Sequence, residues 1–304
     1  VSKMSGAFLA PESNLHLQFA YYQSSLVVEH LTERFGLEAI RNILKDLGEG
    51  VEINAAIAKH TEPLDKLETA FRAYAVAKAK ALAPELDWTK PDSETLRAGM
   101  EKFAKKHPKN FYLLVRQARR ALNDKDWEAV KAPCKELIKL FPRQTNGEGN
   151  PYVMLARAQR ELEEYQAERQ TLEALAAMAD DAYPIFQRLT ELAAEQKDWE
   201  AVRLNCERVL AVNPLLPDTH RHLAMAAEAL NDAPQAIESW QTLLRLDPLD
   251  PAEANYRLAR LLREPDNPRA KRHLLMALEE APRFREALKL LLDWETTEGN
   301  PDEK

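Results

Sequence analysis

Histidine spacing is the first test for chemistry in this chain, because a catalytic zinc site needs two histidines one helical turn apart with a glutamate between them. His30 is followed by a glutamate three residues later, but the second histidine of an HExxH motif is missing. His220 and His222 are two residues apart and would point to different faces of a helix. We therefore predict no metal site and no cofactor.

Other catalytic motifs are also missing from the sequence. The eight glycines are scattered and form no phosphate-binding loop, and no serine stands in a GxSxG nucleophile elbow. Paired carboxylates such as Glu163–Glu164 and Glu279–Glu280 are usual on solvated helix faces. We predict that this chain carries no catalytic residue and is not an enzyme by itself.

The composition favours helices and argues against broad nucleic-acid binding. Of the 304 residues 45% are apolar, and 42 Lys and Arg against 49 Asp and Glu give a net charge of −7. Nucleic-acid binders usually need a basic balance. No uncharged apolar run approaches the length of about 18 residues that a transmembrane helix needs, so no membrane insertion is predicted. The compartment stays open between the cytoplasm, the periplasm and export.

Prolines that close apolar helical runs recur in a fixed register. They are Pro108, Pro142, Pro214, Pro248 and Pro282. The first two are 34 residues apart, and the last three follow one another at the same interval. The remaining gap is two such intervals plus four residues, which the glycine-containing loop Arg143–Asn150 can hold. A constant period of this length is typical of helical repeat architectures.

The residues inside each repeat agree with that period. Ala236, Trp240 and Leu243 have the buried spacing of a second helix, and Leu223–Ala224 and Leu155–Ala156 pair a large with a small residue in the first. This pattern resembles the tetratricopeptide repeat (TPR) family from Phe111 to about Pro282. The resemblance implies an all-α fold, a right-handed TPR superhelix or α–α solenoid. Five units would begin near Phe111, Gly149, Tyr183, Pro217 and Pro251.

Some positions depart from the family pattern. Thr190 replaces a small residue, and Pro133 is expected to interrupt a second helix. We predict a capping helix at Asp92–His107 in front of the repeats and another at Phe284–Glu295 behind them. Residues 91–304 would then form the TPR domain, and residues 1–90 a separate helical domain.

The TPR resemblance also implies a concave groove lined by the first helices. The residues at groove positions are Tyr112, Arg116, Arg119, Arg157, Arg160, Gln187, Arg188, Arg221, His222, Met225, Tyr256, Arg257 and Arg260. Arginine pairs bidentately with carboxylates and aromatic residues supply apolar anchors. We predict that this groove binds a peptide or partner protein with acidic side chains. The alternative is a solvated helix face on which the arginines pair with neighbouring glutamates.

The two cysteines occupy equivalent repeat positions. Cys134 lies nine residues after Lys125 and Cys206 nine after Lys197, each lysine opening a KDWEAV phrase. Equivalent positions two units apart are too distant for a disulfide. We predict two free, buried and unreactive thiols.

The first ninety residues do not follow the repeat period. We expect helices over Leu15–Arg34, Leu37–Leu47, Glu52–His60 and Leu64–Ala81, because Gly36 and Gly48 are natural helix stops. The phrase FAYYQSSLVVEHLTERFGLEAIRNILKDLGEG, from Phe19, with INAAIAKHT and LDKLETAFRAYA after it, resembles the C-terminal helical end of the gluzincin-type, peptidase-MA-like zinc metallopeptidase domain. The resemblance covers about residues 5–80.

That second resemblance implies that a catalytic half with HExxH would lie before Val1, in a longer parent protein. Tyr21 or Tyr22 would then match the tyrosine that stabilises the oxyanion in such enzymes. The interpretation that we favour is that both are aromatics of a buried helix end.

Three functions follow from these patterns. The main prediction is a protein–protein interaction scaffold that holds a peptide or partner protein in its groove. The alternative is a C-terminal fragment of a zinc metallopeptidase-like protein, whose repeats present the substrate. A third, architectural function is self-association through the repeats.

Overall fold

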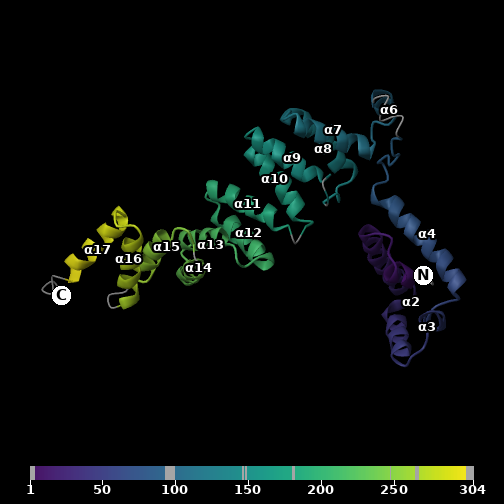
Figure 1. Ribbon diagram of the computed structural model, residues 1–304, viewed down its shortest axis with the longest axis horizontal. Coiled ribbons are helices and arrows are strands. Elements are labelled where there is room, and N and C mark those ends of the chain that lie inside the picture. Colours follow the sequence, from purple (N-terminus) through teal and green to yellow (C-terminus); the bar gives the residue numbers. More distant parts are fainter. Residues whose placement is uncertain are drawn as a thin grey trace. The chain divides into compact units, whose positions relative to one another are not determined.

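The structure is a computed structural model in which every regular element of the described residues is an α-helix (Figure 1). The described residues are 4–92, 100–145, 147, 149–179, 182–246, 248–263 and 267–298. The chain divides into two compact units, Val1–Asp87 and Trp88–Lys304. No described helix combines the length and the apolar content needed to cross a bilayer.

The N-terminal unit contains four helices: α1 (Met4–Leu9), α2 (Asn14–Gly48), α3 (Ile53–His60) and α4 (Leu64–Leu82). The two helices expected around Gly36 form the two halves of α2, and Gly36 itself is non-helical with a φ of 76°. That angle lies in the left-handed region, which glycine adopts without a Cβ clash. Val27 and Leu31 before the kink therefore reach the same apolar core as Ile43 after it.

The exposure of Tyr21 and Tyr22 contradicts the interpretation that they are aromatics of a buried helix end. They are 63% and 58% exposed, and Phe19 on the same helix is 58% exposed. The buried side of this part of α2 is formed by other residues, among them Ala20 and Val27. An exposed aromatic group on an N-terminal helix is a surface feature, not a core feature.

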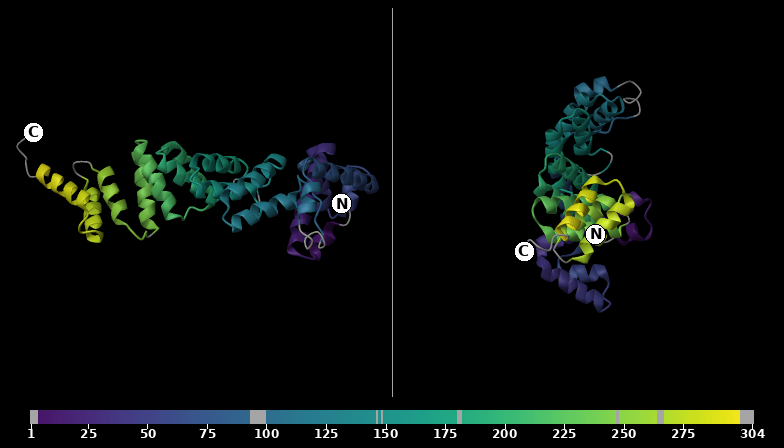
Figure 2. Two further views of the ribbon diagram at one scale, coloured as in Figure 1. Left: turned by 90° about the horizontal axis from the view of Figure 1, so that it is seen from above. Right: turned by 90° about the vertical axis from the view of Figure 1, so that its left-hand side faces the viewer.

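The C-terminal unit is a series of helix pairs followed by a last helix. The elements are α6 (Glu101–Lys106), α7 (Phe111–Asn123), α8 (Trp127–Leu140), α9 (Pro151–Glu161), α10 (Tyr165–Ala176), α11 (Tyr183–Glu195), α12 (Trp199–Val212), α13 (Pro217–Ala229), α14 (Ala233–Arg245), α15 (Ala252–Leu261), α16 (Pro268–Glu280) and α17 (Arg285–Glu298). Each first helix packs on its own second helix, and each second helix packs on the helix that follows it. The pairs follow one another in chain order (Figure 2). The predicted all-α solenoid is confirmed.

The turn between first and second helix shows why the sequence repeats. Lys125, Lys197 and Asn231 each have a φ between 56° and 61°, which ends the first helix in the left-handed region. The next residue is an aspartate in each case, and its carboxylate accepts a backbone N–H of the second helix, as Asp126 does from Ala129 at 3.1 Å. In each KDWEAV phrase the lysine therefore ends the first helix and the aspartate caps the second.

The cores are local to neighbouring helices. Cys134 and Cys206 are both fully buried and free, as predicted. Burial raises the pKa of each thiol to about 12, so both stay protonated and unreactive at neutral pH. Trp240 is also fully buried, and its indole N–H donates to Glu228 at 2.8 Å.

Pro133 does not interrupt its helix, so that expectation is wrong. It lies buried inside α8, which continues to Leu140. Proline removes one backbone donor, but Val130 and Cys134 on either side keep their packing in the core.

The two predicted capping helices lie at the ends of the repeats. Residues 93–99 of the predicted front helix lie outside the described residues, and α17 follows the predicted rear helix closely.

Candidate functional site

The thirteen predicted groove residues all lie on the first helices of the pairs, and none is buried. We call their shared surface the first-helix face. α7 carries Tyr112, Arg116 and Arg119, α9 carries Arg157 and Arg160, α11 carries Gln187 and Arg188, α13 carries Arg221, His222 and Met225, and α15 carries Tyr256, Arg257 and Arg260. The helices differ in what these side chains contact.

A buried carboxylate joins the second and third pairs. Glu168 on α10 is 0% exposed and accepts from the Arg160 Nε at 2.7 Å. Arg188 donates to the same carboxylate from Nε and Nη2, both at 2.9 Å, and from Nη1 to Glu191 at 2.8 Å. Two predicted groove residues are thus brought together by an acid that the groove prediction did not include.

The protonation of this cluster follows from its hydrogen bonds. Burial of Glu168 favours the neutral acid, but the hydrogen bonds from Arg188 and Arg160 outweigh it and hold the pKa of the carboxyl below its usual value. The same hydrogen bonds with Glu168 raise the pKa of Arg188 above its usual value. The carboxylate therefore stays ionised at neutral pH and neutralises part of the arginine charge.

Ion pairs also join the fourth and fifth pairs. Arg221 on α13 contacts Glu253 on α15, and Arg257 on α15 contacts Glu228 on α13, each at 3.4 Å. Arg257 also contacts Glu253 in its own helix at 3.4 Å. His222 makes a 2.8 Å hydrogen bond from its Nδ1 to the Asp218 carbonyl oxygen in its own helix. These arginines stabilise the packing of neighbouring helices.

Arg116 and Arg157 differ from the arginines above. Arg116 is exposed and pairs with no carboxylate of the described residues. The Arg157 guanidinium lies 5.7 Å from the Trp127 ring centroid, within the range of a cation–π contact. Tyr112 is 38% exposed and lies edge-on to Phe111. The N-terminal end of the first-helix face therefore presents positive charge to the solvent.

Two hollows flank Arg116. One of about 500 Å³ is lined by Phe111, Tyr112, Val115 and the arginines of α7. The other, of about 390 Å³, lies toward α6 and is lined by Met100, Ala104, Leu113 and others. Arg116 and Arg120 line both.

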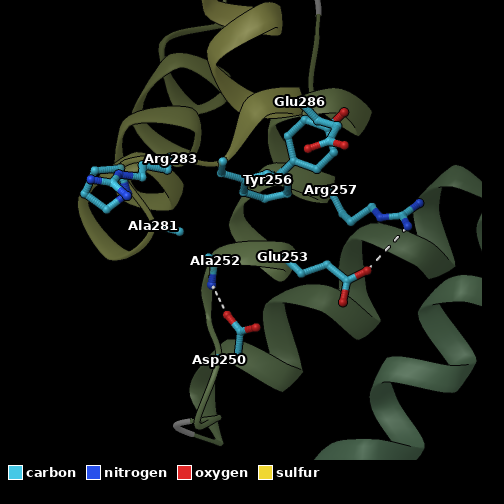
Figure 3. A pocket seen from close by; sticks show the side chains of 10 residues that line it. Asp250, Ala252, Glu253, Tyr256, Arg257, Ala281, Arg283 and Glu286 are labelled. Carbon is cyan, nitrogen blue, oxygen red and sulfur yellow. Dashed lines mark hydrogen bonds and ion pairs between the residues drawn. The ribbon is translucent and has the colours of Figure 1, made fainter.

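A larger hollow of about 780 Å³ lies at the last pair (Figure 3). Tyr256 and Phe284 form an aromatic wall with ring centroids 4.9 Å apart. Figure 3 shows Glu253 reaching toward Arg257 beside Tyr256, whereas the Asp250 carboxylate accepts the Ala252 N–H at 3.2 Å. Glu253, Arg257 and Asp250 are thus engaged with other groups of the protein.

Met225, Tyr256 and Arg260 serve the fold as well as the surface. Met225 packs against the cluster around Trp240, and Tyr256 packs against the last core cluster. Arg260 lies 5.8 Å from the Tyr256 ring centroid. Gln187 is half-buried.

Pairing of the arginines with glutamates was the alternative to a binding groove, but sequence reasoning did not identify Glu168, Glu228 and Glu253 as the partners. A signal for Glu168 was present, because it is the fourth residue of its second helix, the position that Val130 and Val202 occupy in other pairs. Both valines are 0% exposed. A charged residue at a position that is otherwise apolar indicates a buried ion pair.

No group of histidines, cysteines and carboxylates within the described part of the chain could hold a metal ion. In the N-terminal unit, His30 is 4% exposed and lies against the rings of Phe71 and Tyr74. Burial, together with the positive charge of Arg34, lowers the pKa of His30. This histidine packs in the core as a neutral group.

No protein-family model and no curated protein matches the chain. Among solved structures, YrrB, described as a TPR protein with an unusual peptide-binding site, aligns with a TM-score of 0.50 and 13% identity, over 63% of this chain and 97% of that one. The MamA protein aligns with a TM-score of 0.44 and 12% identity, over 64% of this chain and 96% of that one. PilF of Pseudomonas aeruginosa aligns with a TM-score of 0.41 and 16% identity, over 63% and 86%.

The likeness to YrrB shows the fold alone: a TPR solenoid. None of these comparisons supports the peptidase-MA-like resemblance of residues 5–80.

Proposed function

We propose that the chain is a protein-interaction scaffold whose first-helix face binds an extended peptide or partner segment with acidic side chains. The observation that carries this proposal is the position of Arg116 and Arg157, which are exposed on successive first helices and not bound by a carboxylate of the described residues. Guanidinium groups of this kind are suited to carboxylates of a ligand. The fold is shared with YrrB, whose described property is peptide binding.

The later pairs give such a ligand a different surface. Arg188, Arg221 and Arg257 are held by Glu168, Glu228 and Glu253, so their hydrogen-bonding capacity is partly used. Half-buried Gln187, Met225 and Tyr256 can still contact a ligand backbone or an apolar side chain. We therefore propose that the first pairs recognise the charge of the ligand and that the later pairs contact its backbone and apolar side chains.

The test is a binding isotherm with the full chain, acidic and neutral peptides of equal length, and two salt concentrations. Arg157→Glu should weaken acidic-peptide binding by about tenfold, because it removes an attraction and adds a repulsion. Added salt should weaken binding to the unchanged chain, since exposed charges are screened beyond about 10 Å at 0.1 M. Arg285→Glu on α17 is the matched control and should change little. Equal affinity for acidic and neutral peptides would contradict the proposal.

The alternative is that residues 5–80 belong to a zinc metallopeptidase-like protein and that the repeats present its substrate. The exposed Phe19, Tyr21 and Tyr22 favour it, because such a surface would pack against a further part of a parent protein. An HExxH motif upstream in the parent reading frame would support this function, and its absence there would remove it.

Self-association through the repeats stays a prediction, and one measurement tests it. Sedimentation equilibrium would give a mass that rises with protein concentration if the repeats bind one another. A constant monomer mass would remove this function.

A further inference from the structure

Positive charge is concentrated at the start of the solenoid. Residues 100–120 contain seven lysines and arginines and a single carboxylate, Glu101, in a chain with a net charge of −7. The cations are Lys102, Lys105, Lys106, Lys109, Arg116, Arg119 and Arg120. A local excess of this size attracts negatively charged segments and speeds their association.

Much of this charge is open to a ligand. Lys102, Lys105 and Lys106 on α6 are exposed and, like Arg116, pair with no carboxylate of the described residues. Arg120 makes one contact, 3.6 Å to Asp124, with both side chains largely in solvent. Exposed pairs of this kind contribute little to stability. A ligand carboxylate could therefore replace Asp124 at little cost.

The shape of the same region fits an extended segment. The two hollows lie on either side of Arg116, and the walls include Tyr112, Val115 and Leu113. Apolar walls next to open guanidinium groups suit a strand that alternates carboxylates with an aromatic or aliphatic side chain. The positive charge and the apolar walls both come from α7 and the neighbouring α6.

We infer that the α6–α7 end is the anchoring site for the ligand of the scaffold, and that the ligand is an acidic linear peptide with an apolar side chain. This inference rests on the proposed function. Ligand carboxylates bind Arg116 and Arg120, the lysines of α6 add long-range attraction, and the apolar side chain packs in a hollow beside Tyr112. The later pairs extend the contact but do not supply the charge.

The test uses the full chain and a fluorescein-labelled peptide of ten glutamates with one central phenylalanine, followed by fluorescence anisotropy at low salt. The variant Arg116→Glu/Arg120→Glu should weaken binding by about tenfold or more, since each change reverses a charge next to the ligand. The matched control, Arg269→Glu/Arg272→Glu, makes the same change of net charge on exposed residues of α16 and should stay within about twofold. Circular dichroism melts of both variants should match the unchanged chain, because all four side chains are exposed.

The outcomes separate the inference from the function on which it rests. If the unchanged chain binds the glutamate peptide but both double variants reduce the affinity equally, or neither reduces it, the assignment of the anchoring site is wrong and the scaffold function stands. If the unchanged chain does not bind the peptide, the proposed acidic-peptide function itself fails. A peptide with glutamines in place of glutamates should not bind. Tighter binding of a single-stranded oligonucleotide than of the peptide would overturn the inference in favour of a nucleic-acid site.

Discussion

Arg116 on α7 is exposed and unpaired among the described residues, whereas Arg188 on α11 is held against a carboxylate that is 0% exposed. Both are the sixth residue of their repeat unit and both were predicted as groove residues. The difference lies in their partners: Arg188 pairs with Glu168 on α10, the second helix before it, whereas no carboxylate of the described residues pairs with Arg116. A repeat position thus determines where a side chain lies, and its neighbours determine whether it is available for binding.

The largest effect is expected from Glu168→Gln. Removing the buried negative charge leaves Arg160 and Arg188 beside each other without their shared counter-charge, which should lower the free energy of unfolding by about 3 kcal/mol. Urea denaturation followed by circular dichroism measures it. Glu161→Gln on the exposed side of α9 is the matched control and should change stability by less than about 0.5 kcal/mol. Equal effects of the two changes would show that the buried cluster does not stabilise the fold.

The same carboxylate predicts a dependence on pH. The pKa of Glu168 is lowered in the folded state, so its stabilising contribution is fully present above the ordinary carboxyl pKa and is lost as the pH falls through the lower folded value. The difference in stability between the unchanged chain and Glu168→Gln should therefore shrink in acid. Denaturation curves of both proteins at pH 7 and at pH values below about 4 measure it. A constant difference would mean that the ionised form is not what stabilises the cluster.

Charge reversal at the two arginines should separate stability from binding. Arg188→Glu places a carboxylate next to Glu168 and should cost about 2 kcal/mol or more of stability. Arg116→Glu should leave the melting temperature nearly unchanged, because the residue is exposed, while weakening the binding of an acidic peptide. Melting and anisotropy measurements on both variants test the comparison directly. A large loss of stability in Arg116→Glu would show that it has a structural partner after all.

The smallest effect concerns a turn that the first and third pairs share. Lys125 and Lys197 adopt left-handed backbone angles with φ of 56° and 57°, which cost a residue with a Cβ about 1 kcal/mol. Lys125→Gly and Lys197→Gly should therefore each raise the free energy of unfolding by up to about 1 kcal/mol. Similar gains would show that the two pairs differ in electrostatics and not in backbone stability. Lys135→Gly inside α8 is the control and should lower stability by about 1 kcal/mol.

Much of the fold could be predicted because the repeat depends on residues that act over short distances along the chain. The prolines, the lysine–aspartate turns and the equivalent positions of Cys134 and Cys206 each act within one or two helices. Gly36 likewise marks the kink of α2. Pro133 was misjudged because its effect depends on the core around it, in which Val130 and Cys134 keep the helix in place. The exposure of Tyr21 and Tyr22 was misjudged for the same reason, since it depends on what packs beside α2.

The sequence by itself determined the helical repeat, the placement of arginines on successive first helices and the acidic net charge, because propensity, capping and period act over short distances. Tertiary structure alone decided which arginines are neutralised. Glu168 reaches Arg160 in its own pair and Arg188 in the next, and Arg221 and Arg257 meet glutamates across a helix interface. Coulomb attraction between such groups depends on distance and burial, and both are set only when the helices pack.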